Sequence, residues 1–555
     1  MNLGPLLNSQ DNSPRLPTLA IIVLAALYLL IGVTGHDPWK TEDAIHLGIA
    51  HGFATQGHWL TPAIAGEPWP HTAPLYHWVA ALFGQLPGGW LAFHDAARLA
   101  TTLFGALFLV FLAGAARSFH GNSAGRIAPL LTIGTLGLLL PMHEAQPAIA
   151  GLACAALAWW GAGLSLQGRA WGAPLLGLGL GLAFLAHGLV GLIMALAVLP
   201  APIMLAPHAR QFGSLPPTGG ASSWGGPAPT LRRDWKGLAL ALLIALPLIA
   251  IWPWLLAQQA PGFWTQWWQN EFAEATHARG LPVSRHFEQL AWAVWPLWPL
   301  ALWSFWLLRR QIDRLLLPLF GVFITLAWFL TGAPRSLAVL PLIVPLTLVA
   351  AAGADRLRRG AANAFDWFSV MTFSFAAGLI WLGASAQSLG WPPKIANNFT
   401  KLAAGHTADY GLVTLGGAFI ATLIWLLTWG LRRASWRASL RWATGVTLMW
   451  VLISALWLSW IDHGMTYRPV ALSLQQALPQ GVDCIERGDF GHAHRASLDY
   501  FTGIRTMAAG GKPACGWRLT VAERNRNNPA GWTEVWQGGR TSDRKERWYL
   551  DRRNP

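Results

Sequence analysis

The sequence predicts an all-α polytopic membrane domain of about thirteen transmembrane helices, followed by a small C-terminal domain of the α/β or α+β class. Three observations support this fold class. Hydrophobic residues make up 54% of the 555 residues, charged residues only 12%, and tryptophan occurs 35 times, unlike in a soluble protein. Thirteen stretches are long and apolar enough to cross about 30 Å of hydrocarbon as helices. The connecting loops are alternately rich and poor in basic residues.

The first stretch follows a polar leader and lacks a small-residue cleavage site, so we expect a retained anchor with a cytoplasmic N-terminus. One set of alternate loops holds eighteen Lys and Arg residues and the other holds six, which places the poorer set outside the cell. With an odd number of spans, the C-terminal domain is also outside. The expected spans are 17-35, 97-116, 126-142, 147-166, 172-187, 189-206, 237-256, 287-308, 314-332, 336-353, 368-387, 409-430 and 442-460.

The formal net charge of +14 is therefore explained largely by topology, and we do not expect a nucleic-acid partner. Hydropathy falls after residue 461, so we expect a membrane domain over 1-461 and a soluble domain over 462-555. Residues 207-235 are rich in Gly, Pro and Ser, which is typical of a cytoplasmic linker.

The longest exported loop inside the membrane domain is 36-96. Helical spacing of apolar residues predicts one helix from Glu42 to Phe53 and another that begins at Pro74. Both are expected to lie on the outer membrane surface as amphipathic helices. A second exported loop, 258-286, alternates aromatic and polar residues and is a candidate lid.

Cysteine usage fits this topology. Cys484 and Cys515 both fall in the exported tail, where an oxidising compartment favours a disulfide between them. The alternative is two separately buried thiols. Cys154 lies among Gly and Ala in a predicted span, where packing explains it.

Residues 36 to 84 contain the most specific motifs. An acidic pair, Glu42-Asp43, is followed by Gly57-His58-Trp59-Leu60-x-Pro62, then Gly66-x-Pro68, then Pro74-Leu75-Tyr76-His77-Trp78. This pattern resembles the first periplasmic loop of bacterial polyprenyl-phosphate-sugar glycosyltransferases of the GT-C fold, in the superfamily of the aminoarabinose (lipid A) and protein mannosyl transferases. Weaker matches follow at Ala97-Arg98-Leu99, at 181-188, from Trp264 to Asn270 and at Pro334-Arg335.

The resemblance implies an inverting enzyme in the bacterial inner membrane. Its donor would be a sugar on undecaprenyl or another polyprenyl phosphate, and its acceptor lipid A, an envelope glycan or a protein at the periplasmic face. Glu42 occupies the position of the family's catalytic aspartate, and Asp43 matches the acidic residue that follows. A carboxylate there would take the proton of an acceptor hydroxyl. The alternative is that both acids only favour a helix N-terminus, an effect of about 0.3–1 kcal/mol.

Two lysines that the family uses near the lipid phosphate are missing. Thr72 and His187 stand at their positions, and Glu42 replaces aspartate. Imidazoles donate to phosphate and guanidinium groups bind it bidentately, which makes nearby histidines and arginines substitutes. The alternatives are a histidine bonded to a backbone carbonyl at 187, a local pair at His143-Glu144, and arginines that reach lipid headgroups. The substrate-binding candidates are His71, Thr72, Tyr76, His77, His143, His187, Asn270, Arg279 and Arg335.

Motifs for other kinds of chemistry are absent from the sequence. The sequence has no P-loop, no dinucleotide fingerprint, no H-E-x-x-H and no pair of C-x-x-C motifs, which argues against a nucleotide-sugar donor. The sequence assigns no cofactor and leaves a divalent metal open: Glu42, Asp43, His46 and His58 are candidates to surround such an ion, but their spacing is not a recognised ligand pattern. Rival functions are a lipid or polysaccharide transporter, a non-catalytic lipid-binding homologue and an oligosaccharide ligase.

Overall fold

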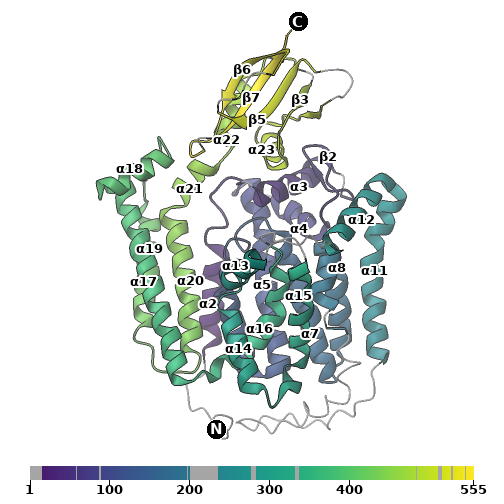
Figure 1. Ribbon diagram of the computed structural model, residues 1–555, viewed down its shortest axis with the longest axis vertical. Helices are drawn as coiled ribbons and strands as arrows, with labels where there is room; N and C mark the ends of the chain where they lie inside the picture. The colour runs from purple at the N-terminus through teal and green to yellow at the C-terminus, as the bar shows by residue number, and fades with distance from the viewer. Residues whose placement is uncertain are drawn as a thin grey trace.

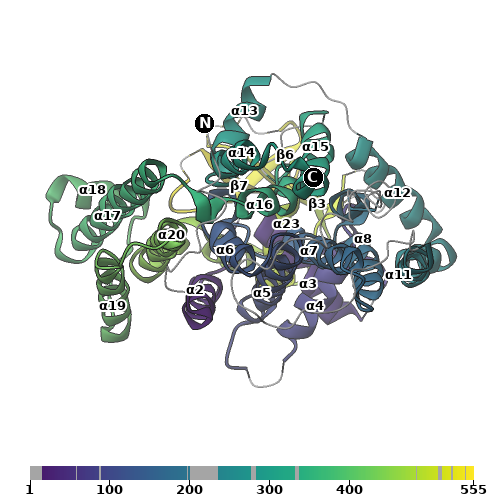
Figure 2. The ribbon, with the colours of Figure 1, turned by 90° about the horizontal axis from the view of Figure 1, so that it is seen from below.

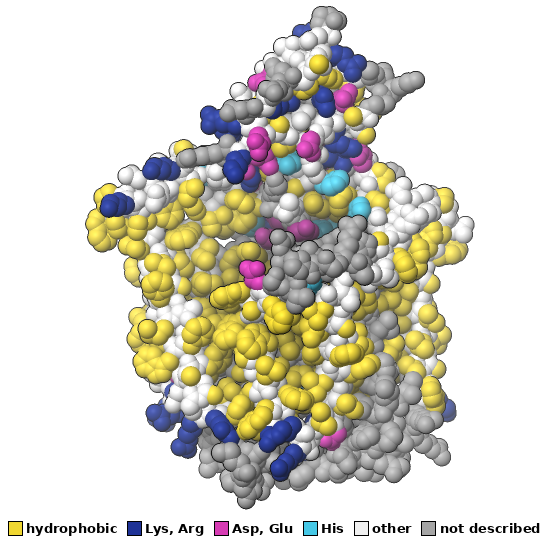
Figure 3. Space-filling model, in the orientation of Figure 1, with side chains coloured by type: hydrophobic (Ala, Val, Ile, Leu, Met, Phe, Trp, Pro, Cys, Tyr) yellow, Lys and Arg dark blue, Asp and Glu magenta, His cyan; other side chains and the backbone are white. Residues whose placement is uncertain are grey.

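The computed structural model describes residues 16–39, 41–57, 59–86, 89–196, 198–199, 235–276, 283–331, 337–482, 484–509, 515–524, 526, 529–543 and 545–554. A helical bundle with a belt of hydrophobic side chains carries a small sheet domain at one end (Figures 1 and 3). The first loop lies between these two parts (Figure 1). Arg279 and Arg335, most of the 207-235 linker and His58 lie outside the described residues.

Six helices of the described residues are long and apolar enough to cross a membrane. Two further helices, α13 (Val283–Ala293) and α14 (Leu297–Leu308), are bent by 83° at the break between them and together pass the same test. The six helices are α5 (Phe93–His120), α7 (Pro147–Leu166), α8 (Gly172–Leu196), α11 (Trp235–Gln259), α17 (Arg359–Leu389) and α20 (Arg437–Leu456).

Several of the thirteen predicted spans are short or broken helices. The stretch 126-142 divides into α6 (Asn122–Ile133) and the 3-10 turn η1 (Leu136–Leu138), and 336-353 into η3 (Leu340–Leu342) and α16 (Ile343–Ala351). The pair 172-187 and 189-206 begins as one helix, α8, which leaves helical geometry at His187 and Gly188. The remaining pieces are α2 (Thr18–Leu30), α15 (Leu316–Thr331), α19 (Leu412–Thr428), α21 (Leu458–Met465), α18 (Pro393–Leu402), η2 (Ile312–Arg314) and η4 (Ala354–Arg356).

The helices form two groups. Helices α5, α7, α8 and α11 pack in succession, whereas α17 and α19 pack on α20 at the opposite side of the bundle (Figure 2). Small residues permit the close contact of α7 with α8, since a Cβ on Gly179 would lie 2.4 Å from the backbone of Ala158. The first loop is attached to the group that contains α5.

The C-terminal domain combines a mixed sheet with two helices, which agrees with the predicted class. Its strand order is β4-β3-β5-β7-β6, with β3 parallel to β4 and β5, and β7 antiparallel to β5 and β6. Leu519 of β5 and Leu550 of β7 are paired in register, and both side chains are fully buried. The elements are α22 (Arg468–Ala477), β3 (Ile485–Arg487), α23 (His492–Thr502), β4 (Met507–Ala508), β5 (Trp517–Glu523), β6 (Trp532–Gly538) and β7 (Glu546–Arg553).

The first loop is packed under this domain. Its helices are α3 (Glu42–Gln56) and α4 (Leu75–Gly84), joined through the hairpin β1 (Ala63–Ile64) and β2 (Glu67–Pro68). Helix α3 contacts α23 so closely that a Cβ on Gly48 would lie 2.7 Å from that of Ala496. The predicted start at Glu42 is correct, but α3 is buried between α4, α5 and α23 and does not lie on the membrane surface.

Candidate functional site

The two acids at the start of α3 have different environments. Asp43 is fully buried and receives two hydrogen bonds from Arg98 of α5, from Nε to Oδ1 at 3.0 Å and from Nη2 to Oδ2 at 2.8 Å. The backbone N–H of Ala145 donates to the same carboxylate at 2.8 Å. Burial alone would raise the pKa of Asp43, but the charge and hydrogen bonds of Arg98 outweigh burial and hold it at about 2. Asp43 therefore fastens the first loop to α5.

Glu42 lies one residue earlier, and its side chain is 48% exposed. Its carboxylate lies 3.2 Å from Nε2 of His46, one helical turn along α3. Nδ1 of His46 lies 3.0 Å from Nε2 of His77 on α4, and Nδ1 of His77 lies 3.3 Å from the carbonyl of Ala73. Burial, with the charge of His46, holds the pKa of His77 well below its usual value. An accessible carboxylate is thus followed by two imidazoles that lead into the protein.

Glu144 adds a third carboxyl group near this acid pair. It follows His143 in the connection between η1 and α7, and its backbone carbonyl accepts a 2.7 Å hydrogen bond from Thr101. Burial raises the pKa of Glu144 to about 7, with a further contribution from the negative charge of Asp43. The negative charge of Glu42 also raises the pKa of Glu144, whereas Arg98 lowers it.

The break in α8 brings His187 toward the same region. Gly188 has φ +57°, a conformation that glycine adopts without steric cost, and the N–H of Leu189 then points out of the helix. The carboxyl group of Glu271 on α12 (Pro261–Thr276) accepts a 2.9 Å hydrogen bond from that N–H. His187 is close enough to Glu274, His46 and Glu42 for their charges to act on it.

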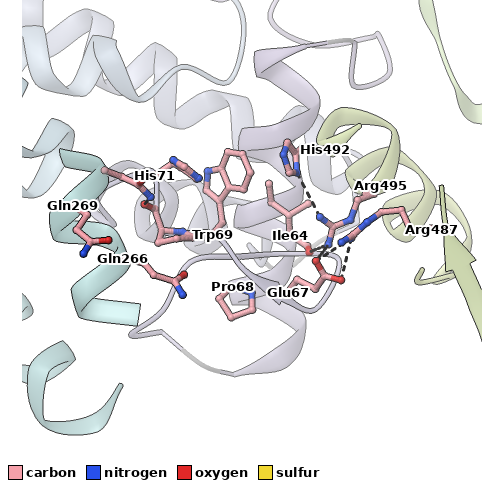
Figure 4. Close-up of a pocket in the computed structure, with 12 residues that line it drawn as sticks. Ile64, Glu67, Pro68, Trp69, His71, Gln266, Gln269, Arg487, His492 and Arg495 are labelled. Atoms are coloured by element: carbon pink, nitrogen blue, oxygen red, sulfur yellow. Dashed lines mark hydrogen bonds and ion pairs between the residues drawn. The ribbon is translucent and has the colours of Figure 1, made fainter. Parts of the chain in front are cut away.

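A cavity of about 350 Å³ opens between the first loop, α12 and the C-terminal domain (Figure 4). His71 and Asn270 line it, and the amide of Asn270 donates a 2.6 Å hydrogen bond to the carbonyl of Pro70. The other lining residues are Ile64, Glu67, Pro68, Trp69, Pro70, Gln266, Gln269, Arg487, His492 and Arg495.

Three predicted substrate-binding residues have structural partners. Tyr76 is fully buried with its hydroxyl 2.8 Å from that of Thr101, and Thr72 donates to the carbonyl of Ala73 at 3.3 Å. His143 bridges the carbonyls of Leu139 and Tyr28. The contacts of His143 are thus to backbone carbonyls and not to Glu144, the partner named in the alternative for this residue.

Sequence reasoning gave no role to several residues of the site. Arg98 appeared only as part of a motif, whereas the structure pairs it, fully buried, with Asp43. Glu271 and Arg495 carried no motif at all. Their placement depends on contacts between segments far apart in the chain, which local spacing cannot reveal.

No group of three or more His, Cys, Asp and Glu residues is arranged to hold a metal ion within the described part of the chain. Glu42, Asp43 and His46 do not converge there, since Asp43 faces Arg98 while Glu42 faces His46.

Known proteins were compared with this chain. No protein-family model matches it. A curated relative, the undecaprenyl phosphate-alpha-4-amino-4-deoxy-L-arabinose arabinosyl transferase of Edwardsiella ictaluri (strain 93-146), is 26% identical over 260 residues, which are 44% of this chain and 41% of that protein. The match therefore spans less than half of the relative's length.

Solved structures extend the likeness to the whole chain. ArnT from Cupriavidus metallidurans bound to undecaprenyl phosphate aligns with a TM-score of 0.68 at 15% identity, covering 96% of this chain and 97% of ArnT. The apo state of the same protein aligns with a TM-score of 0.65 at 16% identity, covering 96% and 97%. The chain has the GT-C fold of ArnT. The fold predicted from the first-loop motifs is thereby confirmed, including the C-terminal domain that ArnT shares over the aligned length.

Proposed function

We propose that the chain is a membrane glycosyltransferase that moves a sugar from a polyprenyl-phosphate donor to lipid A, an envelope glycan or a protein, with inversion at the anomeric carbon. The observation that carries the proposal is the half-exposed Glu42 joined to His46 and His77 at the outer end of the bundle. The ArnT fold and the arabinosyl transferase relative, whose name includes undecaprenyl phosphate, support the donor class.

Glu42 is the proposed general base. The acceptor oxygen forms a bond to the anomeric carbon, the bond from that carbon to the phosphate oxygen breaks, and the polyprenyl phosphate leaves with the electron pair. The acceptor's proton passes to Glu42, which requires a carboxylate within hydrogen-bond reach of the acceptor hydroxyl. Of the acidic pair, only Glu42 has the exposed surface for that contact.

The two imidazoles suit Glu42 to this role. When Nδ1–H of His77 donates to Ala73 and Nδ1–H of His46 donates to His77, one proton remains to be shared by Nε2 of His46 and Glu42. That set contains one proton more than two neutral imidazoles and a carboxylate carry. The set with this proton therefore corresponds to the state after the acceptor has been deprotonated, and the set without it, with Glu42 as a carboxylate, is the form that can act as the base.

Orientation is part of the proposal: the N-terminus in the cytoplasm of a bacterial inner membrane, and the first loop and C-terminal domain in the periplasm. Lys and Arg side chains gather at the end of the bundle opposite the sheet domain (Figure 3). Arg309 and Arg358, which lie over the ring of Trp306, belong to this set. Such a bias supports a cytoplasmic assignment for that end.

The test is complementation of a deletion strain, with envelope extracts analysed by mass spectrometry. Wild-type protein is expected to restore a mass shift of one sugar on a lipid, glycan or protein. Glu42→Gln at the same expression level is expected to restore none. A Glu42→Gln variant that restores the full shift overturns the assignment of the base.

A second candidate, a non-catalytic homologue that binds polyprenyl lipid, is favoured by one observation. Thr72 stands where the family has a phosphate-neutralising lysine, and its hydroxyl donates to its own neighbour's carbonyl. Purified protein that binds polyprenyl phosphate but transfers no sugar from any envelope donor would establish this candidate in place of the enzyme.

A further inference from the structure

The cavity between the two domains has an unusual lining for a membrane protein. Figure 4 shows the amides of Gln266 and Gln269 at one end, the guanidinium groups of Arg487 and Arg495 at the other, and Trp69 between them. Each part comes from a different segment, since the amides belong to α12, the arginines to β3 and α23, and Trp69 to the first loop. Four segments, α12, β3, α23 and the first loop, thus build one polar cavity.

The arginine end is built to hold an anion. Glu67 occupies it at present: Nη1 of Arg487 lies 3.0 and 2.9 Å from its two oxygens, and Nη2 of Arg495 lies 2.7 Å from one of them. Two positive charges therefore face a single carboxylate, which is itself 37% exposed. The end retains an excess positive charge that an incoming anion would neutralise.

Arg495 gives independent evidence. Its side chain is only 4% exposed, yet its Nε has no hydrogen-bond partner within the described part of the chain. A buried guanidinium N–H without a partner costs free energy, so such groups are usually satisfied by a ligand or water. Its other donors contact Glu67, the carbonyl of Ile64 at 3.3 Å and Nδ1 of His492 at 3.4 Å, so Nε is the donor that remains unsatisfied among the described residues.

The rest of the lining fits a sugar ring. Trp69 presents an indole whose face is negative and attracts the C–H groups of a pyranose. Rings of His71 and His492 each lie 4.6 Å from that of Trp69, and the two glutamine amides offer donors and acceptors for hydroxyl groups. The volume of about 350 Å³ is at the low end for ligand pockets, which suits a single head group.

We propose that this cavity binds a sugar ring that carries a phosphate or a carboxylate, with the anion on Arg487 and Arg495 and the ring on Trp69. This inference rests on the proposed function, because the sugar is then part of the acceptor. In the free protein the carboxylate of Glu67 occupies the two arginines, and the anion of the acceptor either replaces it there or binds beside it.

Isothermal titration of the full-length protein in detergent, without donor, tests binding separately from transfer. The probes are glucosamine 1-phosphate, glucuronate, glucose and inorganic phosphate. The two charged sugars are expected to bind, with affinity falling as salt rises, and glucose and inorganic phosphate are each expected to bind at least about tenfold more weakly.

Variants assign the binding to the cavity. Arg495→Gln and Arg487→Gln are expected to weaken the charged sugars by about tenfold or more, and Glu67→Gln to strengthen them several-fold because it frees both arginines. Trp69→Leu is expected to weaken the sugars but not inorganic phosphate. The matched control is Arg524→Gln, an exposed arginine at the end of β5 outside the cavity, which is expected to change nothing.

Two results overturn the inference: equal affinity for inorganic phosphate and the charged sugars, or unchanged affinity in Arg487→Gln and Glu67→Gln, whose side chains are partly exposed and tolerate replacement. Transfer is scored apart. If the protein binds charged sugars but transfers no sugar, the proposed function is wrong and the cavity assignment stands. If the protein transfers sugar but every cavity variant binds charged sugars normally, the cavity assignment is wrong and the proposed function stands.

Discussion

Glu42 and Asp43 are neighbours in sequence and carry the same charge, but their side chains have opposite surroundings. Asp43 points into the bundle, where Arg98 is fully buried with it. Glu42 leaves the helix on the side of His46 and keeps nearly half of its surface exposed. A helix turns about 100° per residue, so one of two adjacent acids faces the core and the other does not.

The first prediction concerns Glu42. Glu42→Gln is expected to lower the rate of sugar transfer by about 10²–10⁴-fold, because the amide cannot accept the acceptor's proton. Glu42→Asp, which introduces the acid usual at this position in the transferases that the first loop resembles, is expected to keep measurable transfer. Initial rates of purified protein with a polyprenyl-phosphate sugar provide the measurement, with Glu523→Gln on β5 as the control for loss of an exposed carboxylate. Equal rates for wild type and Glu42→Gln contradict the role.

The second prediction concerns Asp43. Asp43→Asn removes the carboxylate that binds the buried Arg98 through two hydrogen bonds and leaves only Asp95, 3.1 Å from Nη1, as its counter-ion, which is expected to cost at most about 3–5 kcal/mol of stability. Melting in detergent should show a large fall in midpoint, while Glu42→Gln melts like wild type. Replacing both partners, as Asp43→Ala with Arg98→Met, should recover part of the loss because the buried guanidinium is gone, while Asp95 keeps its hydrogen bond from the N–H of Gly35. A stable Asp43→Asn protein that transfers no sugar would instead make Asp43 catalytic.

The motif located the acid pair in the sequence, but it did not show that Asp43 forms the buried ion pair with Arg98 while Glu42 stays exposed. Spacing placed Glu42 and Asp43 at the start of a helix, and this start is where the structure has it. Which acid faces Arg98 depends on how α3 rotates against α5, a packing question between segments 55 residues apart. The same limit explains why Tyr76 and His143 were proposed for substrate and are found bonded to the core.

At the level of elements, the break in α8 is maintained from outside by α12. Glu271 accepts the N–H of Leu189 and lies so close to Gly188 that a Cβ there would meet its carboxyl oxygen at 1.9 Å. Any side chain at 188 would displace Glu271 and also strain a backbone with positive φ. The predicted boundary between two spans at this position reflects the break rather than a loop.

The third prediction is a pH dependence of this contact. Burial raises the pKa of Glu271 from 4.5 to about 8, so the folded protein holds a proton there that the unfolded chain releases above pH 4.5. Stability from the protonated form is therefore full at low pH and is lost as pH rises through about 8. Glu271→Gln mimics the neutral acid, so its melting midpoint should match that of wild type at pH 5 and exceed it at pH 9. The corresponding difference in the free energy of unfolding is a few kcal/mol at most. If wild type and Glu271→Gln have the same melting midpoint at pH 5 and also at pH 9, the raised pKa of Glu271 is contradicted.

Hydropathy located the apolar segments well and their breaks poorly. Each long helix falls on a predicted span, as α5 does on 97-116 and α20 on 442-460. The stretches 126-142 and 336-353 contain Gly134 and Pro341, and the helices are interrupted near them. An average over a window cannot detect such interruptions, because the broken pieces remain as apolar as a continuous helix.

For the molecule as a whole, the C-terminal domain completes the site of the membrane domain. Asp37 of the first loop is ion-paired with Arg468, and Trp39 donates to Asp462 at 2.8 Å. Tyr500 on α23 lies 2.8 Å from Nδ1 of His94 at the start of α5. These contacts orient β3 and α23 over the first loop, so activity should depend on a domain that contains none of the proposed base residues.

The disulfide between Cys484 and Cys515 provides the test of that dependence. It encloses β3 and α23, the segment that supplies Arg487, His492 and Arg495 to the cavity. Closing a loop with a sequence separation of 31 stabilises a fold by about 3–4 kcal/mol in the chain-entropy model. Removing it should therefore loosen this segment before the helical bundle.

The fourth prediction is that Cys484→Ser with Cys515→Ser lowers acceptor-dependent transfer and charged-sugar binding together, while the protein still inserts and purifies as a monodisperse species. Trypsin should cut the variant within the C-terminal domain, where the segment 484–515 offers basic residues, and leave the bundle intact. Cys154→Ser is the matched control, since its thiol is buried in α7 and lies outside the disulfide. Wild-type transfer in the double variant would mean that the cavity is formed by packing of α23 on α3 alone, and that the disulfide protects the domain without shaping the site.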